Sequence, residues 1–347
     1  MANRLPIEQP FALAVTLEMG QAFRWRRVGD EHGRDRDWGD PPERWRSGGG
    51  WYSGVLGPHL VHIRQVPGGV EYRVGGDDGE REDIDLGQRL RDYFRLDDDI
   101  DAIYAELSHE PAVARAIERH RGLRLLRQDP WECLVSYMCS QTRSIRGTRG
   151  SVGAIAELSR RTVRLGGDVR CVFPTARMVA DPECGMTGLK LGLGKARNIF
   201  AIARELDCDP LALDRMADPS AALPDAVRLL DRYPGVGPKI AGCVALMSLN
   251  RLDAFPVDRW VQRALRECDL SAMPRGSSRL GLPEKISRSG TMTPAQQYVV
   301  AAWAREHFGR YAGYAGQYLF HDVETHKERA RRAGGCPICG GNGSATP

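Results

Sequence analysis

Long apolar runs are absent from this sequence. The longest, YVVAAWA at residues 298–304, falls far short of the ~20 residues that a membrane-spanning helix needs. The opening segment MANRLPIEQPFALAVTL contains no basic stretch followed by a long apolar one, so no secretory leader is expected. The nine cysteines are an odd number, which argues against a disulfide framework and favours reduced thiols. We therefore expect a cytoplasmic protein without a membrane role.

Lysine is scarce as well. Of 49 basic residues only five are lysine, at positions 190, 195, 239, 285 and 327. Arginine would serve for a generic phosphate contact, whereas burial can lower the pKa of a lysine amine and free its lone pair as a nucleophile. Lys239, within YPGVGPKIAG at residues 233–242, is therefore the residue that most needs an explanation.

The composition is that of a globular protein. The chain has 347 residues, of which 42% are apolar and 27% charged, enough for two or three domains with a substantial core. Its formal charge of +4 permits a polyanionic partner without requiring one. A monomer is the default expectation.

The N-terminal region, residues 1–83, carries strand patterns. Residues 12–25 and 51–74 alternate apolar and polar positions, and PGG at 67–69 supplies a turn, so we predict a small antiparallel sheet. Residues 27–50 are rich in glycine, proline and charge, which is typical of a mobile surface insertion.

The remainder of the chain carries helix patterns. Between residues 84 and 330 apolar residues recur three and four apart, and Asp129, Pro130 and Glu132 form a strong helix start. Residues 331–347 are expected to form a flexible tail that contains cysteines. The predicted fold class is α+β, mainly α-helical with an N-terminal antiparallel β-sheet domain.

A helix-hairpin-helix is predicted at residues 225–249. Two amphipathic helices flank a Pro-Gly-Val-Gly turn, whose glycines allow the backbone amides of Gly235, Val236 and Gly237 to converge at the second helix's N-terminus. Such amides bind phosphate without reading bases. The alternative interpretation is a simple connection between two helices.

Downstream residues favour a chemical role. Lys239 and Cys243 lie four apart on one face of the second helix, while its other face is apolar. Asp258 follows at the predicted N-cap of a further helix in PVDRWVQRAL, where backbone amides would hold its carboxylate rigid and ionised. A lysine and a capped carboxylate after a DNA-binding hairpin together indicate catalysis.

These motifs, GVGPK through FPVD, resemble the helix-hairpin-helix DNA glycosylases of base-excision repair. Within that superfamily the chain is similar to the 8-oxoguanine DNA glycosylase/lyase family over most of its length. The matches run from MGQAFRW (19–25) and YSGVL (52–56) through LRDYFRLD, GLRLLRQDPWECLVSYMCS and LGLG to YAGYA and the LF at 319–320.

The resemblance implies an enzyme of DNA repair that needs no cofactor and acts on a damaged base in double-stranded DNA, associated with the nucleoid. Lys239 would be the nucleophile that attacks C1′ and remains attached as a Schiff base, from which β-elimination gives AP lyase activity. Asp258 would steady the developing positive charge. Gly20 would accept the N7 hydrogen of 8-oxoguanine, with Phe320 and Cys243 packing on either side of the base.

The sequence departs from the family pattern at three places, all concerned with recognition. Thr142, Arg143 and Ser144 replace an asparagine run that fills the gap opposite the orphaned cytosine. The family's glutamine aligns with Gly316, and Gln317 lies one residue later, about 100° around a helix. After LGLG the segment is one residue shorter, so either Lys195 or Arg197 would face the orphaned base.

A metal site is a weaker prediction. CPIC at 336–339 has zinc-ligand spacing, so Cys336 and Cys339 with His321 and His326 are candidate ligands, although a mobile end without metal is the competing interpretation. The four-cysteine iron–sulfur pattern found elsewhere in the superfamily is missing.

Three functions stay open from sequence. The first is a bifunctional glycosylase and AP lyase for 8-oxoguanine. The second is a monofunctional glycosylase for another damaged purine, in which Lys239 contacts only phosphate. The third is a non-catalytic helix-hairpin-helix DNA-binding protein, which would gain nothing from a carboxylate near an anionic backbone.

Overall fold

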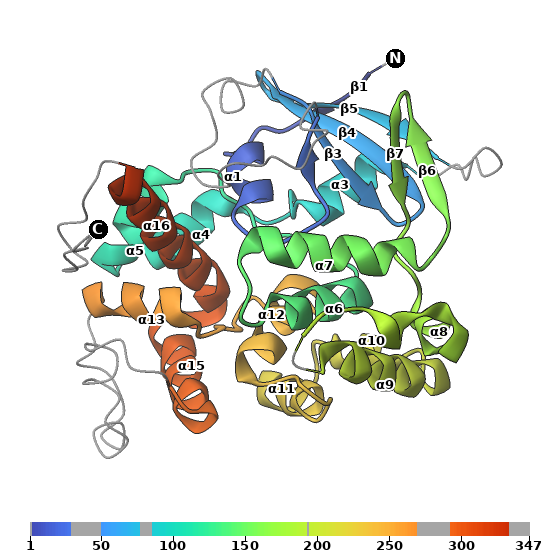
Figure 1. Ribbon diagram of the computed structural model, residues 1–347. Helices are drawn as coiled ribbons and strands as arrows, with labels where there is room; N and C mark the ends of the chain where they lie inside the picture. The colour runs from blue at the N-terminus through green and yellow to red at the C-terminus, as the bar shows by residue number, and fades with distance from the viewer. Residues whose placement is uncertain (1, 29–49, 77–84, 193, 269–291, 333–347) are drawn as a thin grey trace, which may run out of the picture.

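A computed structural model describes residues 2–28, 50–76, 85–192, 194–268 and 292–332. Most of the predicted insertion at 27–50 and of the predicted tail at 331–347 lies outside these residues. Figure 1 shows a twisted sheet at the top of the molecule and a larger helical body below it. The predicted α+β class is confirmed.

The main sheet is antiparallel and has five strands in the order β1-β5-β4-β3-β2. The strands are β1 Asn3–Pro6, β2 Arg26–Arg27, β3 Tyr52–Leu56, β4 His59–Val66 and β5 Gly69–Gly75. Val66 pairs with Gly69 across the turn between β4 and β5, so the hairpin predicted at PGG is confirmed. Leu60, Val61 and Ile63 of β4 are fully buried.

Helices make up most of the rest of the described chain. The α-helices are α1 Leu13–Glu18, α3 Leu86–Tyr93, α4 Ile100–Leu107, α5 Pro111–Arg119, α6 Pro130–Ser140, α7 Ile145–Glu157, α8 Ala176–Ala180, α9 Lys195–Cys208, α10 Ala212–Met216, α11 Leu223–Asp231, α12 Pro238–Ser248, α13 Arg259–Ala264, α15 Pro294–Phe308 and α16 Ala312–Arg332. Short 3-10 turns are η1 Pro182–Cys184, η2 Met186–Gly188, η3 Leu265–Glu267 and η5 Gly309–Tyr311. Within the described ranges, no helix is long and apolar enough to cross a membrane.

Residues 13–18 are helical, so the strand predicted in this segment is wrong. Leu13, Ala14, Thr16, Leu17 and Glu18 of α1 are all buried. A short helix that is covered on nearly every side carries no amphipathic stripe, so its sequence has no period of 3.6 residues. Alternating residue types within six positions then imitate a strand.

A second hairpin interrupts the helical region. Strand β6 (Thr162–Leu165) pairs with β7 (Asp168–Cys171) through a Gly-Gly turn, and the pair packs on β4 and β5 (Figure 1). Asp168 accepts hydrogen bonds from Ser53 of β3 and His62 of β4. The hairpin therefore fastens the helical body to the sheet, although no strand was predicted after residue 84.

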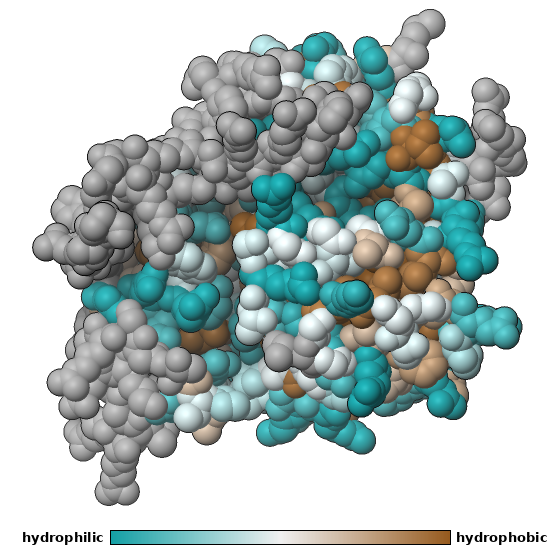
Figure 2. Space-filling model, in the orientation of Figure 1, coloured by the Kyte–Doolittle hydropathy of each residue, from teal (hydrophilic) through white to brown (hydrophobic). Residues whose placement is uncertain are grey.

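Three apolar clusters hold the described residues together, and the smallest consists of Val55, Leu60 and Val163 between the main sheet and β6. The largest lies among α4, α5, α6, α12, α15 and α16, with residues such as Leu134, Val244 and Trp303 at its centre. The second lies between the sheet, α1 and α3. Hydrophilic side chains cover the lower edge in Figure 2, where α9 and α11 turn their outer faces to solvent. This is the amphipathic arrangement predicted for these helices.

Candidate active site

The predicted helix-hairpin-helix is present as α11, a turn at residues 234–237, and α12. Gly235 has φ of +80°, and a Cβ atom there would lie 2.5 Å from Nδ2 of Asn198. The positive φ favours glycine, and any larger residue would also require the Asn198 side chain to move. The side chain of Val236 is buried and its N–H donates to the Tyr233 carbonyl at 3.0 Å. Gly237 caps α12, and Pro238 begins it.

Lys239 is the second residue of α12. The half-buried side chain places Nζ 4.9 Å from the ring centroid of Tyr137 on α6. An aromatic face at this distance attracts a cation. One turn later, Cys243 is buried in the main core. Both residues lie in α12 and are four apart, so they share one face of the helix, as predicted.

Asp258 occupies the N-cap of α13, as predicted. Its Oδ1 atom accepts hydrogen bonds from the N–H groups of Trp260 and Val261, both at 2.8 Å. Two amides therefore fix the carboxylate plane, while Oδ2 lies outside this cap. Asp258 is half-buried.

Lys239 and Asp258 lie close enough to Cys243 to shift the pKa of its thiol, and Cys243 and Asp258 lie close enough to Tyr137 to shift the pKa of its hydroxyl. Burial raises the pKa of the Cys243 thiol, the Lys239 amine lowers it, and the Asp258 carboxylate raises it. Burial also raises the pKa of Tyr137, to which Cys243 and Asp258 add. Because such effects need proximity, the structure brings Lys239, Cys243 and Asp258 together around Tyr137.

Gly20, in the N-terminal region, lies next to a residue that contacts Tyr137. It follows α1 with φ of +83°, and a Cβ atom there would lie 3.1 Å from Cδ1 of Ile145. The carbonyl of the next residue, Gln21, accepts hydrogen bonds from Gln128 Nε2 at 3.0 Å and the Tyr137 hydroxyl at 3.3 Å. Tyr137 therefore links the Gly20 turn to the lysine.

Gln21 fixes this turn and was not predicted. Its side chain is buried, donates from Nε2 to the Arg124 carbonyl at 2.8 Å, and accepts from the Leu126 N–H at 3.0 Å. The nitrogen and the oxygen of this side-chain amide are thus both hydrogen-bonded to backbone groups more than 100 residues away in sequence. The only sequence signal was a polar residue within an otherwise apolar MGQAF segment.

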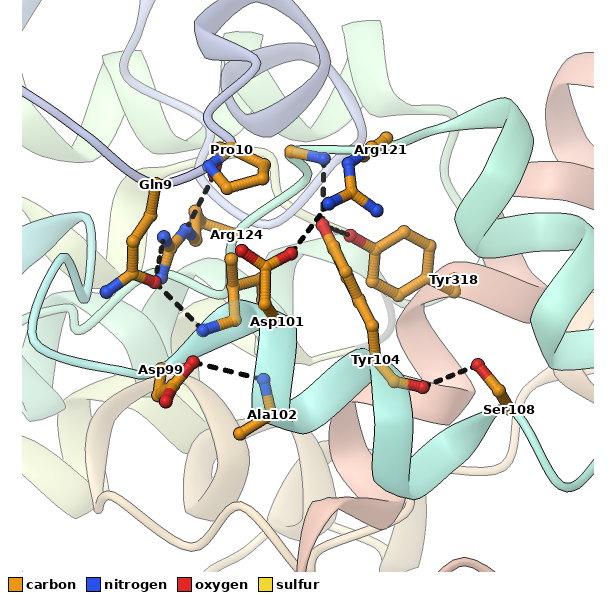
Figure 3. A network of polar contacts seen from close by, with 12 residues as sticks. Gln9, Pro10, Asp99, Asp101, Ala102, Tyr104, Ser108, Arg121, Arg124 and Tyr318 are labelled. Atoms are coloured by element: carbon orange, nitrogen blue, oxygen red, sulfur yellow. Dashed lines mark hydrogen bonds and ion pairs between the residues drawn. The ribbon is translucent and has the colours of Figure 1, made fainter.

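Helix α16 is anchored to residue Leu123, which lies next to the backbone groups that Gln21 binds. The Tyr318 hydroxyl donates to the Leu123 carbonyl at 3.0 Å and lies 2.8 Å from the Tyr104 hydroxyl, a pair visible in Figure 3. Its neighbours Gln317 and Phe320 are half-buried, and α13 packs against this helix. The part of α16 that contains Gln317 and Phe320, which are predicted to line the base pocket, is therefore held beside α13, whose N-cap is Asp258.

Gly316, which aligns with a glutamine of the family that the sequence resembles, packs closely on a neighbouring ring. A Cβ atom on Gly316 would lie 2.9 Å from the Phe255 ring, three residues before Asp258. Phe255 in turn stacks on Phe308 with ring centroids 5.7 Å apart. A longer side chain at position 316 would require Phe255 to move.

The predicted DNA-contacting residues divide into two kinds. Thr142, Arg143 and Arg197 are exposed. Lys195 is only 2% exposed, and its Nζ donates to the Gln141 and Cys139 carbonyls at 2.5 and 3.3 Å. The prediction that Lys195 faces the orphaned base is therefore wrong in this structure, because its amine binds backbone inside the protein. Arg197 stays the candidate.

The proposed zinc ligands lie mostly outside the described side chains. The His321 ring packs on His120 with centroids 4.5 Å apart, whereas the side chain of His326 and both Cys336 and Cys339 are not described. Among the described residues, no group of three or more His, Cys, Asp or Glu side chains is placed to hold a metal ion.

Comparison with known proteins adds independent support. Residues 4–134 match the family described as 8-oxoguanine DNA glycosylase, N-terminal domain. The chain is 29% identical over 322 residues to N-glycosylase/DNA lyase OGG1 of Arabidopsis thaliana, covering 89% of this chain and 76% of that protein. It is 30% identical over 267 residues to N-glycosylase/DNA lyase of Saccharomyces cerevisiae, covering 72% and 69%.

A solved structure agrees. That of MBOgg1 in complex with a low-affinity DNA ligand has a TM-score of 0.70 and 26% identity, and the match covers 96% of each chain. The antiparallel sheet and the helical body therefore have the fold of this solved structure. On these findings the chain belongs to the 8-oxoguanine DNA glycosylase family.

Proposed function

We propose that this protein is a bifunctional DNA glycosylase and AP lyase that removes 8-oxoguanine from duplex DNA through Lys239. One observation carries the proposal: the Lys239 amine lies 4.9 Å from the centroid of the Tyr137 ring, whose hydroxyl donates to the carbonyl next to Gly20. The Cys243 thiol follows one turn after Lys239, and the capped Asp258 carboxylate is close enough to raise the pKa of that thiol. An amine that can act as a nucleophile and a fixed carboxylate are then close together.

The proposed reaction begins with the neutral Lys239 amine attacking C1′ of the damaged nucleotide. The N-glycosidic bond breaks as the bond between C1′ and Nζ forms, and the base leaves with its electron pair and takes one of the two protons of Nζ. The Nζ lone pair then expels the ring oxygen O4′, which takes up a proton from solvent, and this leaves an iminium between C1′ and Nζ. This iminium acidifies the C2′ hydrogens, so loss of one proton expels the 3′ phosphate by β-elimination.

The surrounding groups suit this sequence of charges. As the base leaves, positive charge develops on the sugar, and a preorganised carboxylate such as Asp258 stabilises that charge strongly in a water-poor site. The Tyr137 face, 4.9 Å from Nζ, favours a cation at this atom. The iminium is such a cation.

Base selection is assigned to the Gly20 carbonyl, Cys243, Phe320 and Gln317. 8-Oxoguanine presents an N–H donor at N7, where guanine presents a lone pair. A buried carbonyl therefore discriminates by ~1–3 kcal/mol. The damaged nucleotide must leave the duplex stack to reach Lys239, which costs a few kcal/mol more.

DNA would be held from the hairpin side. Amides at Gly235 and Gly237 and the N-terminus of α12 suit a phosphate, and the exposed Arg143 and Arg197 suit the strand opposite. Such contacts are independent of sequence, which a repair enzyme of the nucleoid requires.

The proposal is tested by single-turnover assays on a duplex with one 8-oxoguanine opposite cytosine, comparing the wild type with Lys239→Gln. We expect base release and strand cleavage in the wild type and the loss of both in the variant. Base release that survives in the variant would instead establish a monofunctional glycosylase. Tight DNA binding by the wild type without release on any lesion would establish a binding protein.

A further inference from the structure

Three loops distant in sequence are joined at the hairpin side of the molecule. The turn after α6 is tied to the hairpin, because Gln141 Nε2 donates to the Gly235 carbonyl at 2.8 Å. It is tied to the segment before α9, because Arg143 Nη2 donates to the Leu191 carbonyl at 2.8 Å. These are the loops that carry the candidate DNA contacts.

Lys195 lies beneath this junction. It begins α9 yet is only 2% exposed. Both acceptors of its amine, the carbonyls of Cys139 and Gln141, lie at the C-terminal end of α6, where helix carbonyls lack internal partners and the helix dipole favours a cation. Burial lowers the pKa of Lys195, and the nearby Arg143 lowers it further, so the buried amine depends on these carbonyls.

The Gln141 carbonyl is the centre of the arrangement. Besides Lys195 Nζ at 2.5 Å it accepts the hydroxyl of Thr142 at 2.6 Å. Thr142 has φ of +58°, a left-handed conformation that a β-branched residue adopts only when its surroundings impose it. The two donors fix this peptide, and the turn then presents Thr142 and Arg143 to solvent.

We propose that Lys195 is a positioning residue for DNA binding. It touches no DNA itself, but its buried ammonium fixes the 141–143 turn so that this turn and the hairpin meet the duplex as one preformed surface. A surface that is already ordered loses less conformational entropy on binding. The inference rests on the proposed function only in that duplex DNA is the ligand.

The test is the salt dependence of binding to a duplex that carries a tetrahydrofuran abasic analogue opposite cytosine, from 50 to 200 mM salt. A lysine that contacts phosphate contributes about 0.9 to the slope of log K against log salt. For Lys195→Met we expect Kd to rise about tenfold at every salt concentration with the slope unchanged. A slope reduced by about 0.9 would make Lys195 a phosphate contact, and an unchanged Kd would remove its role; either result overturns the proposal.

Two further variants sharpen the test. Lys190→Met removes the same charge from an exposed position of the neighbouring loop, and we expect it to raise Kd less than Lys195→Met. An equal rise in the two variants would show that Lys195 does no more than an exposed lysine of that loop, which would contradict the proposal. Gln141→Ala leaves Lys195 in place but cuts the link to Gly235, and we expect Kd to rise about threefold with the slope unchanged. This variant decides the question if Lys195→Met does not fold, because a wild-type Kd for it would contradict the proposal.

Binding to the abasic analogue requires no base release. A wild-type protein that binds this duplex but fails to release 8-oxoguanine would therefore refute the proposed chemistry and leave the comparison of Lys195, Lys190 and Gln141 valid.

Discussion

Replacing Gln21 by alanine separates the positioning of Gly20 from general stability. Gln21→Ala removes the partners of two buried backbone groups, the Arg124 carbonyl and the Leu126 N–H. Each group left unpaired costs about 1–3 kcal/mol, so we expect the free energy of unfolding to fall by about 3 kcal/mol. Urea unfolding followed by circular dichroism measures this loss.

The same substitution should also slow base excision. Gln21 holds the turn whose carbonyl we assign to the N7 hydrogen of 8-oxoguanine, and a displacement of about 1 Å in a substrate-positioning group costs on the order of 10²-fold in rate. We therefore expect the single-turnover rate of 8-oxoguanine release, measured below the unfolding transition, to fall about 100-fold.

Gln65 provides the matched control. Its side chain also bonds two backbone groups, accepting from the Leu13 N–H at 2.8 Å and donating to the Phe11 carbonyl at 3.2 Å, but it is half-exposed on β4. Gln65→Ala should cost about 1 kcal/mol of stability and leave excision unchanged. Equal excision rates in Gln21→Ala and Gln65→Ala would refute the role assigned to the Gly20 turn.

The remaining predictions concern three other sites. Asp258→Asn should leave α13 folded, because an asparagine oxygen caps a helix as well as an aspartate oxygen. The rate of single-turnover excision should fall at least about 10²-fold, because the negative charge is lost. An unchanged rate would show that Asp258 serves only as a helix cap. Gly316→Gln should destabilise the protein in urea because its Cβ meets Phe255 at 2.9 Å, and adding Phe255→Val should recover the stability; if the single variant is as stable as the wild type, the ring does not define this space. Burial alone would raise the pKa of Asp168, but hydrogen bonds from His62 and Ser53 and nearby arginines outweigh it and lower that pKa. The stability it contributes is therefore fully present above pH ~4, near the unfolded value, and decreases as pH falls from there toward the lowered pKa of the folded state. Asp168→Asn should therefore be less stable than the wild type at pH 6, by a margin that shrinks toward pH 2 in urea titrations.

The residues with local sequence signals were predictable. The hairpin glycines, the caps at Asp129 and Asp258, and the spacing of Lys239 and Cys243 depend on neighbours within about four positions. The structure confirms each as a local feature: Glu132 N–H, for example, donates to Asp129 Oδ1 at 2.8 Å. Such features can be predicted from the sequence because the geometry of neighbouring residues alone determines them.

Features that depend on distant contacts were missed. Gln21 and Tyr137 join segments more than 100 residues apart. The polar Gln21 within the apolar MGQAF segment was the only local signal, and it does not show which residues the side chain binds. Lys195 looked like a surface cation because it follows a glycine-rich turn, and only the tertiary position of the α6 C-terminus explains its burial. The β6–β7 hairpin does carry a local signal, TVRL-GG-DVRC, but it is short and lies within a region whose dominant pattern predicts helices.

The most direct test of the central claim is to identify the residue that becomes attached to DNA. Wild-type protein would be trapped with borohydride on the 8-oxoguanine duplex, digested, and the modified peptide sequenced by mass spectrometry, a simple task with five lysines in the chain. The account predicts one adduct, on Lys239. An adduct on another lysine, or base release with none trapped, would contradict it.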